Sequence, residues 1–336
     1  MNKLYALLAR HNASLYLTML AVFALMAYIN GDKFLSAYNI GSMAYQLPII
    51  GLLSVGMMIS MLTGGINLSI IANANLNGII IWQVLEFLTG PGRMKEAGTT
   101  AIVIAILAGF MVSGLVGLIN GFLIAVFEIP DILVTLGTMT LIGGLNIVIT
   151  RGYTITGFPA SLNWIGNGQI YSIPVPILLF LLAVIITSVI LYRTRFGFSL
   201  YMMGANATAA RYSGVNLTRV IVAQYILSAC FASLTSLVMI GQLNSIKSNY
   251  AESYLLVAVL ASFLGGVDPL GGFGRIGGVL AATVILQIIS SGLNLMRMDP
   301  FMITAMWGAI IIIIIFAKAL TGVIKRHWQP TSQSGK

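Results

Sequence analysis

Residues 101–126 read AIVIAILAGFMVSGLVGLINGFLIAV, a run of 26 residues without one charged side chain. A helix needs about 20 mostly apolar residues to cross the hydrocarbon core of a membrane, so this stretch predicts a membrane-spanning helix. Hydrophobic residues make up 58% of the whole 336-residue chain and charged residues only 7%. Charged residues make up about 25% of a typical soluble domain. The sequence therefore predicts a membrane protein whose outer surface faces lipid.

The same rule finds ten candidate spans along the chain. Lys3 and Arg10 precede the first span in the manner of a signal peptide. No small-residue cleavage site follows, so we expect this segment to remain as a signal anchor. The predicted fold is all-α, a polytopic transmembrane helical bundle that forms a single domain over residues 1–336. The spans lie near residues 13–29, 43–61, 66–87, 101–126, 132–150, 174–192, 218–241, 253–266, 277–295 and 301–318.

The distribution of basic residues tests this count, because lysine and arginine concentrate on the cytoplasmic side of membrane proteins. Ten spans with both termini in the cytoplasm place 11 of the 17 basic residues inside and 6 outside. Because the basic residues are scattered over the whole chain and form no patch, membrane topology accounts for the net charge of +9, and a nucleic-acid-binding surface is not needed to explain it. Ten spans also divide into two sets of five, which permits the inverted repeat of many transporters. The two halves share no convincing sequence identity, so the repeat is a possibility only.

The third predicted span is the richest in polar side chains. At 100° per residue Ser69, Asn73 and Asn77 fall on one helical face, whereas Asn75 points the opposite way. Polar side chains are costly in lipid, so this face should look into the bundle. It could hold helices together by hydrogen bonds or line the path of a polar solute. Asn67 follows a glycine pair and is predicted to cap a helix at a break in the span.

A second uncharged stripe lies in the ninth span, where Gln287, Ser291 and Asn294 follow one another at spacings of four and three. Amides and hydroxyls both donate and accept hydrogen bonds, which suits a hydroxyl-rich solute better than an ion. Ion-coupled carriers commonly keep a charge near the membrane midplane. None is evident here, because the eight acidic residues fall in or near loops or at a span end: Asp32, Glu86, Glu96, Glu128, Asp131, Glu252, Asp268 and Asp299.

The predicted cytoplasmic loop at about residues 193–217 contains an ordered element. Asn206 can cap a short alanine-rich helix that Gly214 ends. This helix could simply lie at the membrane surface, or it could dock a soluble partner. The candidate docking residues are Asn206, Ala209, Ala210, Arg211, Tyr212, Ser213 and Gly214.

Several enzymatic functions find no support in the sequence. The chain contains no GxxxxGK[ST] motif and so lacks the phosphate cradle of a P-loop ATPase. Residues 272–277 match GxGxxG, but no β-α-β context accompanies them, and the glycine-rich run at residues 265–278 instead predicts a tight connection with close helix packing. Cys230 is the only cysteine and lies in an apolar run, which excludes an intramolecular disulfide. No acid–base pair, metal-ligand set or activated nucleophile is apparent, so an integral-membrane enzyme has little support.

Several segments, in order, resemble the ribose-type permease family, the inner-membrane component of binding-protein-dependent monosaccharide ABC transporters. The resemblance covers nearly the whole chain. It is carried by residues 56–58 (GMM), 64–69 (GGINLS), 117–121 (GLING), 134–140 (VTLGTMT), 193–197 (RTRFG), 209–214 (AARYSG), 264–266 (LGG), 271–274 (GGFG) and 292–295 (GLNL).

This resemblance implies the membrane-spanning permease subunit of an ATP-binding-cassette importer in the bacterial cytoplasmic (inner) membrane. Such a subunit forms the path for a monosaccharide or sugar-like solute that an extracytoplasmic binding protein delivers. It implies a second permease copy, identical or closely related, and separate ATPase subunits that bind ATP and Mg. No cofactor or metal on this chain and no nucleic-acid partner are expected. In the family a cytoplasmic helix inserts into a groove of the ATPase, and Asn206 to Gly214 is the matching stretch.

One departure from the family pattern concerns the substrate. Relatives commonly carry aspartate where this chain has Asn67, and a glycine-containing continuation where it has residues 69–72. Without that carboxylate the sequence does not predict the family's usual pentose. Hexoses, other furanoses and sugar-derived signalling molecules stay open, as do the nucleosides and branched-chain amino acids that more distant relatives transport. A secondary carrier also stays open, because ion sites can be built from carbonyl groups alone.

Overall fold

The computed structural model of the chain describes residues 2–327. The predicted cytoplasmic Lys336 lies outside this range. A helix occupies each of the ten predicted ranges. These helices are α1 (Asn2–Asn30), α3 (Ala37–Met61), α4 (Ile70–Thr89), α5 (Thr99–Phe127), α6 (Asp131–Thr150), α8 (Val175–Arg193), α11 (Leu217–Leu243), α12 (Tyr254–Leu264), α13 (Ile276–Leu295) and α14 (Pro300–His327).

Within the described part of the chain, seven of these helices are long and apolar enough to cross a membrane: α3, α4, α5, α6, α8, α11 and α13. Shorter apolar stretches lie in the other three, at Leu15–Asn30, Tyr254–Leu264 and Pro300–Ile313. The prediction of a polytopic helical bundle is therefore confirmed.

Short elements join the long helices. They are α2 (Asp32–Leu35), the 3-10 helix η1 (Met94–Glu96), α7 (Ala160–Asn167), α9 (Arg195–Ala205), α10 (Ala207–Tyr212) and four two-residue strands. Strand β1 (Ile155–Thr156) pairs antiparallel with β4 (Ser245–Ile246), with Ile155 opposite Ile246. Strand β2 (Gln169–Ile170) pairs antiparallel with β3 (Ile173–Pro174).

Helices α3 and α11 form the centre of the bundle. Two-thirds or more of the most apolar window of α3, α4, α11 and α13 is buried, against 28% for α5 and 22% for α6. The largest apolar core joins α3 and α11 to parts of α4, α8, α12 and α13. Exposed leucine, isoleucine and valine side chains cover the outer faces of α5, α6 and α8. Such faces suit contact with lipid tails.

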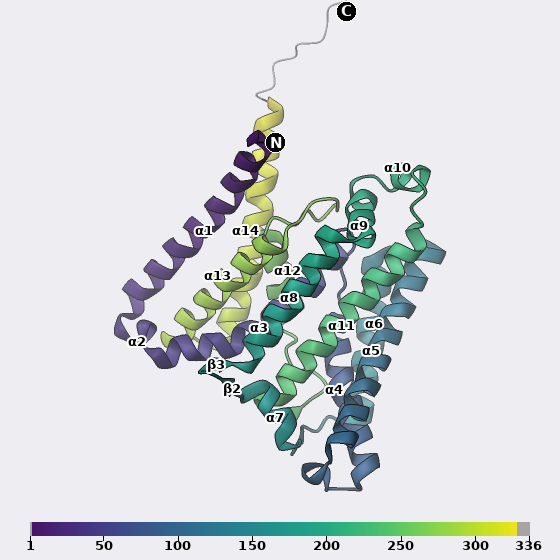
Figure 1. Cartoon of the computed structure of the whole chain (residues 1–336). Helices are drawn as coiled ribbons and strands as arrows, with labels where there is room; N and C mark the ends of the chain where they lie inside the picture. The colour runs from purple at the N-terminus through teal and green to yellow at the C-terminus, as the bar shows by residue number, and fades with distance from the viewer. Residues whose placement is uncertain (1, 328–336) are drawn as a thin grey trace, which may run out of the picture.

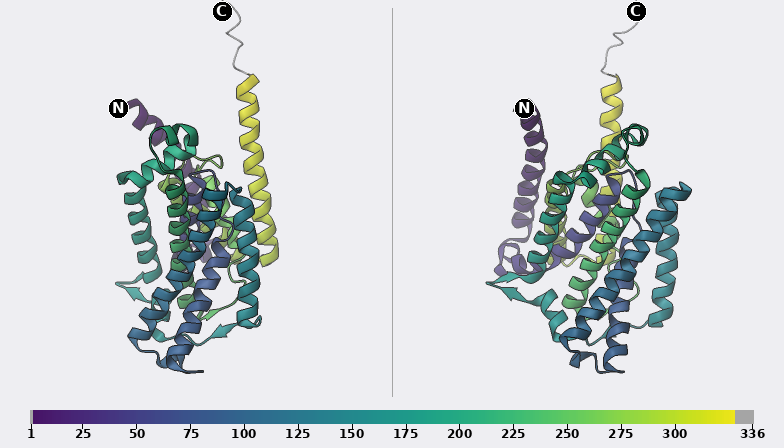
Figure 2. Two further views of the ribbon diagram at one scale, coloured as in Figure 1. Left: turned by 90° about the vertical axis from the view of Figure 1, so that its right-hand side faces the viewer. Right: turned by 45° about the vertical axis from the view of Figure 1, so that its right-hand side comes forward.

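The two ends of the bundle differ. Figure 1 shows the start of α1, the end of α14 and the α9–α10 pair at one end, with α7 at the opposite end. The views in Figure 2 agree with this arrangement. We refer to these as the α10 end and the α7 end. Both ends of the described chain therefore lie at the α10 end.

Two irregular segments interrupt the helices. Residues 62–69 join α3 to α4, and residues 244–253 join α11 to α12. Helix α12 has 11 residues, or about 16 Å of helix, which is too short to cross a membrane alone. The segment before it is partly buried: Ser245, Ile246 and Ser248 are buried, whereas residues 252–253 next to the helix are exposed. Irregular backbone at membrane depth requires such burial, since lipid supplies no hydrogen bonds.

Candidate functional site

A chain of hydrogen bonds crosses the bundle through the segment between α3 and α4. The Thr138 hydroxyl of α6 donates to Asn120 Oδ1 at 2.6 Å, and the Asn120 amide of α5 donates to Ser69 Oγ at 2.9 Å. Ser69 donates to Asn67 Oδ1 at 2.7 Å, and Asn67 donates to Ser228 Oγ of α11 at 2.9 Å. Four separate segments are thereby joined away from lipid.

The prediction that Asn67 caps a helix is wrong. Helix α4 begins at Ile70 with Ser69 at the capping position, and no side-chain cap bond forms there within the described chain. Both ends of the Asn67 amide are already engaged, by Ser69 and by Ser228. The segment passes between α5 and α11, so its polar side chains bond to those helices instead of the first turn of α4.

The remaining residues of the predicted face look into the bundle, as expected. Asn73 donates to the Ser113 carbonyl of α5 at 3.3 Å, and Asn77 donates to Ser233 Oγ of α11 at 3.0 Å. Both side chains are almost inaccessible, at 2% and 0% exposure. In this structure they bond α4 to its neighbours; a solute-lining role for them stays a prediction.

Asn75 has a structural role that the sequence did not reveal. Its amide donates to the carbonyls of Ser248 and Tyr250 at 3.1 and 3.0 Å. Both acceptors lie in the irregular segment before α12, more than 170 positions along the chain. Asn75 therefore fastens that segment to α4 from the face opposite Asn73 and Asn77.

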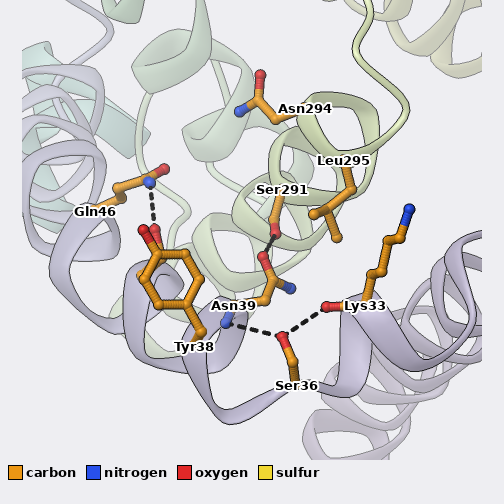
Figure 3. Close-up of a pocket in the computed structure, with 9 residues that line it drawn as sticks. Lys33, Ser36, Tyr38, Asn39, Gln46, Ser291, Asn294 and Leu295 are labelled. Atoms are coloured by element: carbon orange, nitrogen blue, oxygen red, sulfur yellow. Dashed lines mark hydrogen bonds between the residues drawn. The ribbon is translucent and has the colours of Figure 1, made fainter.

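A polar pocket of about 440 Å³ opens where α2 and the start of α3 meet the end of α13 (Figure 3). At its base Ser291 donates to Asn39 Oδ1 at 2.8 Å. Gln287 donates to Oε1 of the pocket residue Gln46 at 3.1 Å. The lining residues are Lys33, Ser36, Tyr38, Asn39, Ser42, Gln46, Ser291, Asn294 and Leu295.

The structure brings the predicted stripe of α13 together with this pocket, but only in part. Ser291 and Asn294 line it, and Asn294 is exposed. Gln287 is buried, and its Oε1 has no hydrogen-bond partner among the described residues. The first stripe, on α4, does not reach this pocket. The two stripes therefore belong to different polar regions of the bundle.

Sequence reasoning missed the α3 side of the pocket. Asn39, Ser42 and Gln46 follow one another at spacings of three and four, the same pattern that identified the stripe on α13. The predicted second span began at residue 43, so the first two residues were left in a loop. Extending that span by about one turn would have exposed the pattern.

The short helix at the α10 end is confirmed. Asn206 Oδ1 accepts the Ala209 amide at 2.9 Å and so caps α10, which ends at Tyr212. Gly214 follows with a φ of 84°. Tyr212 is 89% exposed, and Ala209, Arg211 and Ser213 are exposed too, whereas Ala210 packs inward. The helix thus lies at the α10 end of the bundle with several side chains open to a partner.

Asp131, which the sequence analysis placed in or near a loop, contacts the buried core of the bundle. Asp131 is the first residue of α6, and its carboxylate accepts a hydrogen bond of 3.0 Å from the hydroxyl of Tyr225 on α11. Tyr225 is fully buried. The carboxylate packs against Gly65, where a side chain would overlap it. This contact joins α6, α11 and the α3–α4 segment at the α10 end.

A bundle of membrane-length helices with a hydrogen-bonded interior and a polar pocket defines a multi-pass membrane protein of the transporter type. Comparison with known proteins identifies the family. The chain belongs to the family described as "Branched-chain amino acid transport system / permease component", which matches residues 39–317. Its members are permease subunits of transport systems and not enzymes. No solved structure matches the chain.

Several characterised permeases are similar over most of their length. The ribose import permease protein RbsC of Bacillus subtilis is 34% identical over 296 residues, which is 88% of each chain. The autoinducer 2 import system permease protein LsrD of Yersinia enterocolitica is 28% identical, over 83% of this chain and 82% of its own. The D-allose transport system permease protein AlsC of Escherichia coli is 26% identical, over 87% and 86%. The resemblance to ribose-type permeases is confirmed.

Proposed function

We propose that this chain is the permease subunit of an ABC importer that takes a monosaccharide or a sugar-like solute into a bacterial cell. The observation that carries the proposal is the 34% identity to a ribose import permease over 88% of both chains. Relatives named for autoinducer 2 and allose are 28% and 26% identical over 83% and 87% of this chain. The uncharged amides and hydroxyls of the pocket suit a hydroxyl-rich solute, since they both donate and accept hydrogen bonds.

The proposed topology has ten spans with both termini in the cytoplasm of the inner membrane, so the α10 end faces inward. The position of both described ends at the α10 end of the bundle supports it (Figure 1). The two irregular segments support a five-plus-five inverted repeat, because each follows one of the two central helices. Residues 62–69 follow α3 at the α10 end, and residues 244–253 follow α11 toward the other end. Interrupted spans at corresponding positions of two halves are typical of such repeats.

The solute route begins, in this proposal, at the pocket between α3 and α13. The exposed Asn294 and Gln46 would meet the solute first, with the buried Ser291 and Gln287 behind them. Asn67, Ser69, Asn73 and Asn77 would act by holding α4 between α5 and α11. Their burial and their bonds to neighbouring helices support this division.

The partners follow from this class of transporter. Separate ATPase subunits would bind ATP and Mg and dock on α10 at the cytoplasmic surface. An extracytoplasmic binding protein would deliver the solute at the α7 end, and a second permease copy, identical or closely related, would complete the membrane unit within the lipid. The exposed, capped helix α10 supports the docking assignment.

Uptake into proteoliposomes tests the substrate class. The chain would be reconstituted with the ATPase and the binding protein that its neighbouring genes encode. Labelled ribose, allose, autoinducer 2 and leucine would then be offered outside the vesicles together with the binding protein, with ATP enclosed inside the vesicles for the ATPase. We expect ATP-dependent uptake of one of the sugars or of autoinducer 2. Uptake of leucine alone would refute the sugar assignment and favour a branched-chain amino acid permease.

A further inference from the structure

Backbone segments from three parts of the chain meet without intervening side chains at the α10 end. They are the last turn of α9, the α3–α4 segment and the loop between α12 and α13. Four glycines make the approach possible: Gly64, Gly204, Gly271 and Gly272. We call this contact the glycine junction.

Gly204 lies at the centre of the junction. A methyl group in its place would overlap the carbonyl oxygen of Leu62 and the amide nitrogen of Gly272. These two backbone atoms already form a hydrogen bond of 2.8 Å with each other. Gly271 and Gly272 have φ values of 92° and 80°, which side chains on L residues disfavour. Backbone atoms cannot move aside as a flexible side chain can, so only glycine fits at Gly204.

Tyrosine side chains brace the same contact. The Tyr201 hydroxyl of α9 donates to the Gly274 carbonyl at 2.8 Å, and the Ile276 amide donates to the Tyr192 hydroxyl at 3.3 Å. Burial raises the pKa of Tyr201 above the usual value for tyrosine, so its hydroxyl keeps the proton that it donates. The loop before α13 is therefore fixed to both α8 and α9.

The joined segments lead to the polar regions of the bundle. Helix α10 follows α9 after the single extended residue Asn206, whose amide closes α9 on the Met202 carbonyl at 3.0 Å and whose side chain caps α10. From the junction, α3 runs to Asn39 and Gln46, and α13 runs to Ser291, all at the pocket. A rigid displacement of α10 would accordingly move both walls of the pocket.

We propose that the glycine junction makes α9, α10 and the adjoining ends of α3, α4 and α13 one rigid unit, and that Gly204 is a positioning residue for coupling. Through it, movement of a partner ATPase bound at α10 reaches the helices that form the pocket. The inference rests on the proposed docking of an ATPase at α10. It adds the mechanical connection between that surface and the solute route.

Alanine substitution separates coupling from assembly. In the complete transporter, Gly204→Ala should leave ATPase binding intact but lower the solute transported per ATP by at least about fivefold, the lower end of typical coupling between sites. Gly277→Ala is the matched control, because no described atom lies within 4 Å of a methyl group there. It should transport as the wild type does. Equal transport per ATP in the two variants would overturn the inference.

If Gly204→Ala fails to assemble, a distance measurement tests whether the glycine junction is rigid. Spin labels at the exposed Thr208 and Phe273, in a chain with Cys230 replaced by alanine, span the junction from α10 to the α12–α13 loop. A rigid unit predicts the same distance distribution in nucleotide-free and ATP-bound complexes, and a broader one after Tyr201→Phe. A shift of the main distance between the two states would overturn the inference.

The proposal that the ATPase docks at α10 and the proposal that the glycine junction is rigid can be refuted independently. If the ATPase still binds and drives transport after Arg211→Glu, docking at α10 is wrong. The distance across the junction is measured without reference to where the ATPase binds, so it still reports whether α10 and the α12–α13 loop move together.

Discussion

Replacing Asn75 by leucine should loosen the irregular segment before α12. The side chain is 1% exposed, and its amide is shared by the carbonyls of Ser248 and Tyr250. Leucine has a similar size but donates no hydrogen bond. A buried carbonyl left without a partner costs about 1–3 kcal/mol, so two of them set a range of about 2–6 kcal/mol.

Two effects bring the expected decrease in the free energy of unfolding toward the lower part of that range. Asn75 Oδ1 has no partner among the described residues, and leucine removes this buried acceptor. Side-chain hydrogen bonds in membrane proteins also contribute only about 0.6 kcal/mol on average, because the unfolded state in the membrane finds other partners. We therefore expect Asn75→Leu to lower the free energy of unfolding by about 2–3 kcal/mol.

Unfolding by sodium dodecyl sulfate in mixed micelles, followed by circular dichroism, measures this change. Gln83→Leu is the matched control, since Gln83 lies on the same helix with an exposed side chain. Such surface changes usually fall within about 0.5 kcal/mol of the wild type. Hydrogen exchange at residues 244–253 should quicken in Asn75→Leu alone. Equal stability of the two variants would refute the bridging role of Asn75.

Further substitutions test the surface helix and the two polar regions. Arg211→Glu should prevent co-purification with the ATPase, and unchanged transport would exclude docking at α10. Asn206→Ala removes the cap on the Ala209 amide, which should cost about 1 kcal/mol and speed hydrogen exchange within α10; unaltered exchange would contradict the capping role. Asn294→Leu should lower uptake about tenfold, the effect of losing about 1.4 kcal/mol of solute interaction, with assembly intact. Asn73→Leu should instead lower stability, as detergent unfolding would measure; reduced uptake at full stability would return Asn73 to the solute route.

The sequence predicted the helices well because apolar length is a local property. Each of the ten predicted ranges contains a helix in the structure. The cap at Asn206 was equally accessible, since its partner Ala209 is three positions away. Composition and residue spacing were enough to predict these features because the contacts that form them are local in the sequence.

The site was less predictable because its partners lie far apart along the chain. Asn39 and Ser291 are 252 positions apart, and Asn67 and Ser228 are 161 apart. A single sequence contains polar stripes but does not state which stripes meet. Asn67 illustrates the consequence: its position favoured a local cap, while the packing of α5 and α11 around it gave its amide other partners. The glycine junction depends on three distant segments in the same way.

The most direct test of the central claim concerns the energy source. Purified chain would be reconstituted alone, and in parallel with its ATPase and binding protein, into vesicles with an imposed proton or sodium gradient. We predict no accumulation by the chain alone under either gradient, and accumulation by the full assembly that requires ATP and persists when the gradients are collapsed. Accumulation by the chain alone, driven by an ion gradient, would show a secondary carrier and contradict the assignment as an ABC permease subunit.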